Sequence, residues 1–206
     1  MKRILSIGLV CMMLTILLTG CGDTLKADCD TVYIQKKGTI IGASVESFDQ
    51  DYYEEEELKA FIDKEVEDYQ KSHEEDSLKV TDFSVKDKQA ALFIKYAGYE
   101  DYADFNKVTL FAGTIPQALA AGYDFDASFM AIKDGKTGQE VSGQEIMELE
   151  DKVVILSEKI DVKVDGKITY VSSANAEIKS EDTVSLKLQE DSTNGEELSL
   201  VYVIYE

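Results

Sequence analysis

The chain has 206 residues, and its 41 Asp and Glu outnumber its 21 Lys and Arg, so its formal net charge at pH 7 is −20. A surface this acidic repels the phosphates of nucleic acids and of anionic lipids, so we expect no nucleic-acid partner and a domain that stands off the membrane surface. The chain has one His and three Cys, but the N-terminal features described below leave only Cys29 free. One His and one Cys cannot supply a multi-ligand zinc cluster, and we expect neither a metal centre nor a cofactor.

The N-terminal segment has the features of a secretory signal peptide. Lys2 and Arg3 precede an almost wholly apolar run over residues 4–18. This run is shorter than the roughly 20 residues that a membrane-spanning helix needs, and it has the length of a signal-peptide core. It is not followed by the A-x-A-like site at which ordinary secretory signals are cut, so a different kind of processing is expected.

The four residues Leu18-Thr19-Gly20-Cys21 resemble the lipobox of bacterial lipoproteins, which signal peptidase II processes. The resemblance implies cleavage between Gly20 and Cys21 and a diacylglycerol group on the sulfur of Cys21, the lipidation site. Residues 1–20 are then a lipoprotein signal peptide, and residues 21–30 are a lipidated tether. We therefore expect a protein anchored in the cell membrane by its lipid and facing outside, or facing the periplasm if the cell has two membranes.

Cys29 is the one cysteine left after this processing, because Cys11 leaves with the signal peptide and Cys21 is acylated. No disulfide can form within the mature chain. Lys26 is the only nearby cation in the sequence, so a reactive thiol of low pKa has little support at Cys29. We expect this cysteine to have no chemical role.

Residues 31–127 combine strand and helix patterns. Two β-rich runs flank Lys36-Lys37-Gly38 and predict a hairpin that continues to about Val45. Strands are expected over residues 78–86 and 90–96, with a bulge between Val80 and Phe83 where the alternation slips. A short helix is expected over residues 99–105.

A long helix is predicted between these strand pairs. Asp51 and Glu54 resemble a capping box, and the pattern extends to about His73. Its apolar residues fall at helical spacing and predict one stripe that packs on the sheet, formed by Leu58, Phe61, Ile62, Val66 and Tyr69.

The next segment is predicted to be a strand followed by a short helix. The strand covers residues 107–111, and Thr114 is expected to cap a helix over residues 117–121. Pro116 suits the first turn of this helix, and Gly122 suits its end.

From residue 128 onward, short strands separated by turn signals dominate. Asp165-Gly166 is typical of a two-residue hairpin turn, and Asn194-Gly195 predicts another turn. A helical turn is expected over residues 143–149. The expected strands cover residues 129–133, 139–141, 153–156, 160–164, 168–171, 184–188 and 198–205.

Together these patterns predict an α+β fold with antiparallel sheets, one long amphipathic helix in the N-terminal half and a β-rich, sandwich-like C-terminal half. We place an α+β part at residues 31–127 and a β-rich part at residues 128–206. No Pro- or Ser-rich linker separates them, so one continuous domain is the alternative.

No catalytic motif is recognisable. His73 lies among acidic residues at the end of the predicted helix, and neither G-x-S-x-G nor S-x-x-K occurs. Asp49/Asp51 and Asp124/Asp126 bring oxygen ligands together, but neither follows the calcium-loop pattern, so solvated carboxylates are favoured over a weak structural calcium ion. No catalytic residue is assigned, and no ligand-binding residue can be named.

The densest aromatic region is favoured as core around the short helix over an exposed binding surface. It consists of Tyr96, Tyr99, Tyr102, Phe105 and Tyr123.

The mature sequence also resembles small lipoproteins of Gram-positive bacteria, over residues 108–125 and at the ending Tyr202-Val-Ile-Tyr205. This resemblance implies no activity. We expect a non-enzymatic module of the cell envelope that binds an envelope protein, a peptide or a wall component through a surface supported by the β-rich half. The alternatives are an extracellular hydrolase that uses carboxylates and a lipoprotein that binds a small ligand.

Overall fold

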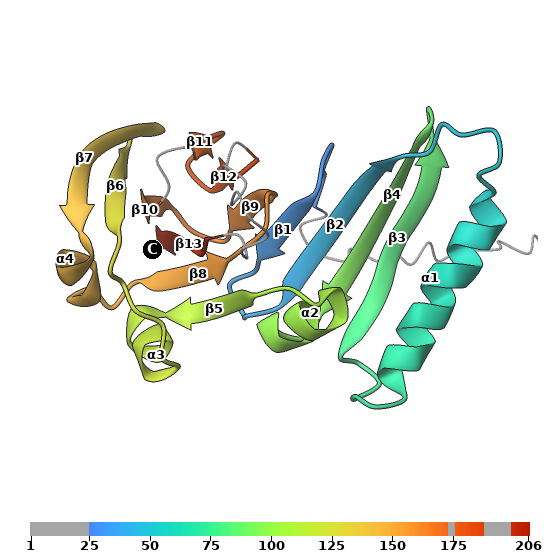
Figure 1. Cartoon of the computed structure of the whole chain (residues 1–206), viewed down its shortest axis with the longest axis horizontal. Helices are drawn as coiled ribbons and strands as arrows, with labels where there is room; N and C mark the ends of the chain where they lie inside the picture. Colours follow the sequence, from blue (N-terminus) through green and yellow to red (C-terminus); the bar gives the residue numbers. More distant parts are fainter. Residues whose placement is uncertain (1–24, 173–175, 188–198) are drawn as a thin grey trace, which may run out of the picture.

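The computed structural model describes residues 25–172, 176–187 and 199–206, and it shows an α+β fold with two sheets (Figure 1). The predicted signal peptide, Cys21, Leu188 and the Asn194-Gly195 turn lie outside the described residues. Within the described part, no helix is both long enough and apolar enough to cross a membrane.

The first sheet has seven strands in the order β11-β12-β9-β1-β2-β4-β3. Neighbours pair antiparallel except β1 and β9, which pair parallel with Val32 opposite Val162. The strands are β1 (Thr31–Ile34), β2 (Ile40–Ser47), β3 (Leu78–Lys86), β4 (Gln89–Tyr96), β9 (Asp161–Val164), β11 (Glu177–Ile178) and β12 (Thr183–Ser185).

The second sheet has six strands, all paired antiparallel, in the order β5-β8-β13-β10-β6-β7. They are β5 (Leu110–Thr114), β6 (Ser128–Lys133), β7 (Lys136–Ser142), β8 (Lys152–Leu156), β10 (Ile168–Val171) and β13 (Val201–Tyr205). The helices are α1 (Glu55–Gln70), α2 (Tyr99–Asn106), α3 (Ile115–Ala120) and α4 (Gly143–Met147).

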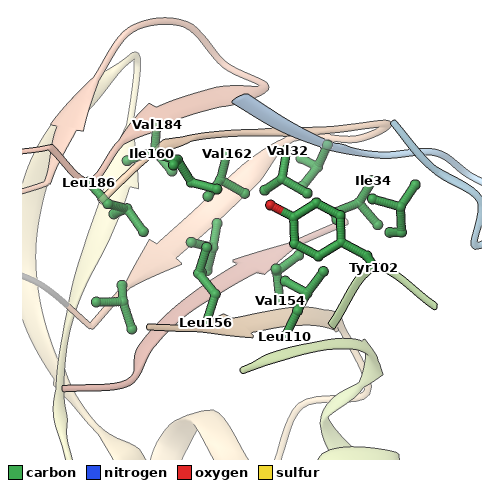
Figure 2. Packing of buried hydrophobic residues seen from close by; sticks show 14 of the residues in the cluster. Val32, Ile34, Tyr102, Leu110, Val154, Leu156, Ile160, Val162, Val184 and Leu186 are labelled. Carbon is green, nitrogen blue, oxygen red and sulfur yellow. The ribbon is translucent and has the colours of Figure 1, made fainter. Parts of the chain in front are cut away.

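The central strands β8 and β13 of the second sheet are buried on both faces. Along β8, Val154 and Leu156 belong to a core shared with the first sheet, whereas Val153 and Ile155 belong to a core formed with α3 and α4. Successive side chains of a strand point to opposite faces, so an unbroken apolar run supplies both cores. Figure 2 shows Tyr102 from α2 filling the space within the shared core.

Several local predictions are confirmed. The hairpin of β1 and β2 has the expected turn, in which Gly38 has a φ of +86°. β3 and β4 pair around Asp87 and Lys88, and their register shifts between Val80 and Asp82, as the predicted bulge requires. Thr114 caps α3 in a capping box with Gln117.

The predicted start and stripe of α1 are partly wrong. The helix begins at Glu55 after Glu54, which makes no side-chain capping bond, so Asp51 and Glu54 do not form a capping box. It ends at Gln70, before His73. Ile62 is buried, and Val66 and Tyr69 pack against the shared core, but Phe61 faces solvent. The helix lies beside β3 (Figure 1).

Asp165-Gly166 does not form the predicted hairpin, because β9 and β10 belong to different sheets. The chain crosses between the sheets here, and the Asp165 carboxylate accepts hydrogen bonds from the Tyr33 hydroxyl and the Lys36 amide. A Cβ on Gly166 would lie 2.0 Å from the carbonyl oxygen of Glu206. This dipeptide therefore allows a close approach of two chain segments.

Other boundaries also moved. The strand predicted at residues 107–111 lies at Leu110–Thr114, and the strand predicted at residues 139–141 is the longer β7, which begins at Lys136 after an Asp134-Gly135 turn. Each sheet contains strands from both sides of residue 127. The first sheet combines β1, β2, β3 and β4 with the later strands β9, β11 and β12, and the second sheet combines β5 with later strands.

Candidate binding surface

Exposed aromatic rings gather where β2 leads into α1. Tyr52 is 73% exposed and Tyr53 is 41% exposed. The Tyr53 ring lies 5.0 Å from the Tyr52 ring, edge to face, and 5.0 Å from the Phe48 ring. These three rings form one continuous cluster outside the cores.

The first turns of α1 extend this cluster. Glu54, Glu57, Leu58 and Phe61 follow the i, i+3, i+4, i+7 spacing, which places them on one side of the helix. Glu57 and Leu58 line an open hollow of about 490 Å³ together with the three rings, and Phe61, 59% exposed, continues the same side.

The chain around Phe48, Tyr52 and Tyr53 is rich in carboxylates. Residues 46–57 contain seven Asp and Glu and no Lys or Arg. We call the surface formed by Phe48, Tyr52, Tyr53 and Phe61 with Glu46, Glu54 and Glu57 the aromatic–acidic surface. Aromatic faces attract cations, and the carboxylates strengthen that attraction.

Backbone hydrogen bonds hold this surface in place. The Phe48 amide donates to the carbonyl of Lys88 in the β3–β4 turn at 2.8 Å, and the Tyr53 amide donates to the carbonyl of Gln50 at 3.1 Å. The pKa of Tyr53 is raised, mainly by the nearby Tyr52 hydroxyl and to a smaller extent by desolvation and by Asp49. Tyr53 is therefore a neutral phenol at neutral pH.

The aromatic group singled out in the sequence is core, as expected. Tyr96 and Tyr102 are buried, and Tyr99, Phe105 and Tyr123 pack against the two cores. In the sequence, the signal for the exposed rings is the Tyr52-Tyr53 pair inside an acidic run. The helical spacing of Phe61 instead matches the inner stripe, so the sequence alone does not reveal its exposure.

His73 contacts both a serine and a carboxylate just after the end of α1. Its Nε2 lies 3.2 Å from Asp104 Oδ2, and its Nδ1 lies 3.1 Å from Ser72 Oγ and 2.9 Å from the carbonyl of Tyr69. Both ring nitrogens therefore face hydrogen-bond acceptors, and the ring stacks on Tyr69. His73 is itself exposed, so these contacts lie at the surface of the protein.

The paired aspartates make local contacts. Asp124 Oδ1 accepts a hydrogen bond from the Asp126 amide at 3.4 Å, and Asp49 Oδ1 accepts one from Gln50 at 3.0 Å. Among the described residues, no three His, Cys, Asp or Glu side chains are grouped so that they could hold a metal ion.

Cys29 has more charged neighbours than its sequence context indicated. Its thiol donates to Asp161 Oδ2 at 3.2 Å, and Lys187 also interacts with it. Burial raises the pKa of Cys29, Lys187 lowers it and Asp161 raises it again, and the net shift is upward. The thiolate is therefore disfavoured, in line with the sequence, although the fold adds Lys187, which is distant along the chain, to its neighbours.

Comparisons with models of protein families, with curated proteins and with solved structures find no match. The functional argument therefore depends on the geometry of this chain.

Proposed function

We propose that this protein is a lipid-anchored module of the cell envelope that binds a cationic segment of another protein through the aromatic–acidic surface. The observation that carries the proposal is the exposure of Tyr52 and Tyr53 within residues 46–57, where seven carboxylates occur and no basic residue, together with the exposed Phe61 on the following turns of α1. In this proposal Cys21 carries the lipid, no chemical step is catalysed, and α1 is an amphipathic helix whose outer side contacts the partner.

The chemistry of the surface favours Lys and Arg side chains. Their apolar stems can pack on the rings of Tyr52 and Phe61, while their charged ends face Glu54 and Glu57. Each cation–π contact contributes about 0.5–2 kcal/mol, depending on how far it is desolvated. The net charge of −20 adds long-range attraction that accelerates encounter and weakens with salt.

The binding test uses full-length protein purified from membranes in a nonionic detergent. Isothermal titration calorimetry with a peptide of about ten lysines should detect salt-sensitive binding, and the double variant Tyr52→Ala/Phe61→Ala should weaken it by roughly tenfold. The matched control is Leu119→Ala/Met147→Ala, which removes two apolar side chains that are each 38% exposed elsewhere. Equal affinity of both variants for the peptide would refute the role of the aromatic–acidic surface in binding. Binding of a wall glycan oligomer in place of the peptide would refute a cationic protein segment as the partner.

Mass spectrometry tests the anchoring separately. The native protein should begin at Cys21 with a diacylglycerol on its sulfur, and Cys21→Ser should release the chain from the membrane fraction. A retained leader or an unmodified Cys21 would contradict this part of the proposal while leaving the peptide test unaffected.

A further inference from the structure

A polar pocket of about 520 Å³ lies where the tether meets the face of the first sheet that is formed by β1, β9 and β12. Its lining includes residues 25–28 of the tether, β9 and the segment around β12. Three lysines and three aspartates line it, so the pocket is electrically neutral although the whole chain carries a charge of −20. The lysines are Lys26, Lys163 and Lys179, and the exposed Lys187 follows β12 nearby, in contact with Cys29 of the tether.

Two of these lysines are held in place yet keep donors for a ligand. Lys179 Nζ lies 2.7 Å from Asp161 Oδ2, and Lys163 pairs with Asp182. Their side chains are 38% and 30% exposed. An ammonium group has three N–H donors, so each pair leaves donors that can reach a phosphate oxygen at the mouth of the pocket.

The tether limits how far this pocket can be from the lipid. Only three residues lie between Cys21 and Leu25, which lines the pocket, so the Cα atoms of Cys21 and Leu25 are at most about 14 Å apart even when the chain is fully extended. The headgroup layer of a bilayer is itself about 5–7 Å thick on each side. A lipid at Cys21 therefore holds the mouth of the pocket within reach of the headgroups.

We propose that this face contacts the bilayer and that its lysines bind the phosphate headgroups of anionic lipids. The inference rests on the proposed lipid anchor at Cys21. It revises the expectation that an acidic chain stands off the membrane, because the tether holds close to the lipid a pocket in which three lysines balance three aspartates, unlike the strongly acidic chain as a whole. α1 packs beside β3, at the opposite edge of the same sheet from β11 and β12 (Figure 1), so the aromatic–acidic surface is left free for a partner.

The test uses single tryptophan reporters, since the chain has no Trp. Full-length lipidated protein with Ala27→Trp in the pocket lining, or with Phe61→Trp on α1, is reconstituted into vesicles of phosphatidylcholine with or without phosphatidylglycerol. A lipid that carries a nitroxide on its headgroup quenches fluorescence only at close range. The Ala27→Trp reporter should be quenched strongly, and more so with phosphatidylglycerol, whereas the Phe61→Trp reporter should be quenched little in either vesicle.

Charge reversal then tests the lysines. Lys26→Glu/Lys187→Glu, placed on the Ala27→Trp chain, should reduce its quenching by roughly half or more in phosphatidylglycerol vesicles. The matched control Lys59→Glu on α1 should not, and circular dichroism melting should confirm that all variants fold. Equal quenching of the two reporters, or quenching unaffected by the double reversal, would overturn the inference while the anchor stands. Protein that does not float with vesicles would overturn the anchor and the inference together.

Discussion

Lys179 Nζ lies 2.7 Å from Asp161 Oδ2, and the aspartate side chain is only 5% exposed. Cys29 donates to the same oxygen, so one buried carboxylate ties the tether and the segment before β12 to β9. Lys59 and Asp63 on α1 form an ion pair of the same length, but both of their side chains are about 60% exposed. These two pairs share a geometry and differ in burial.

Lys179→Met should therefore destabilise the fold by about 1–3 kcal/mol, because it leaves a buried carboxylate with weaker partners. Lys59→Met should cost less than about 0.5 kcal/mol, since water solvates Asp63 when the lysine is removed. Urea unfolding at neutral pH measures both changes. A similar loss of unfolding free energy in the two variants would show that the burial of Asp161 does not strengthen its ion pair with Lys179.

The same pair predicts a pH dependence. Burial raises the pKa of Asp161, but hydrogen bonds from Lys179, Ser185 and Cys29 together lower it by more than burial raises it. The net shift of this pKa is downward from 3.8. A carboxyl group with a lowered pKa in the folded state stabilises the protein above its unfolded-state pKa, and this stabilisation is lost as the pH falls through the folded-state pKa. The stability gap between wild type and Lys179→Met should stay constant at neutral pH and narrow below about pH 4. A gap that widens on acidification would contradict this assignment.

Glu158 is predicted to behave in the opposite way. Desolvation raises its pKa, the hydrogen bond from Tyr102 lowers it and Asp30 raises it again, with a net upward shift. Its ionisation therefore costs stability as the pH rises through the folded-state pKa. Glu158→Gln keeps an oxygen for the Tyr102 hydroxyl, 3.2 Å from Oε2 in the wild type, and should raise the free energy of unfolding at neutral pH.

Unfolding experiments on Glu158→Gln at several pH values check this sign. The gain should disappear at about pH 4, where the wild-type carboxyl group is itself protonated. Glu150→Gln, at an exposed position, is the control and should change little at any pH. A loss of stability in Glu158→Gln at neutral pH would mean that the ionised carboxylate is the favoured partner of Tyr102.

Gly143 is required by a close contact with another part of the chain. A Cβ at this position would lie 1.6 Å from the carbonyl oxygen of Phe125, so Gly143→Ala must push α4 away from residues 125–127. We expect a loss of about 1–3 kcal/mol in unfolding free energy, in spite of the higher helix propensity of Ala. Gly98→Ala should cost less, because its new Cβ meets only the end of the Glu100 side chain and the loss is limited to the preference for Gly over Ala at the N-cap of α2.

Local chemistry explains which elements could be predicted. Thr114 caps α3 through Gln117, three residues away, and Asp87 and Lys88 form the turn between two adjacent strands. Ser142 and Glu145 form a second capping box, which caps α4. The S-x-x-E pattern of these residues in the sequence is typical of such a helix start. Each of these features depends on residues close together in the chain.

The candidate surface was harder to predict because it depends on which side of α1 is covered. Phe61 and Ile62 are both apolar, and only the position of α1 beside β3 decides that Ile62 is buried and Phe61 is exposed. The hairpin predicted at Asp165-Gly166 is wrong for a similar reason. Gly166 lies against Glu206, which is 40 residues later in the chain, and the dipeptide does not pair the two strands that flank it.

By itself, the sequence determined the class of fold, most strand and helix positions and the strongly acidic charge, because these properties follow from composition and from contacts within a few residues. Only the tertiary structure decided which strands share a sheet, which rings remain exposed and where lysines gather beside the tether. Those outcomes depend on contacts such as that between Cys29 and Asp161, which are 132 residues apart, and no periodicity along the chain encodes such pairings.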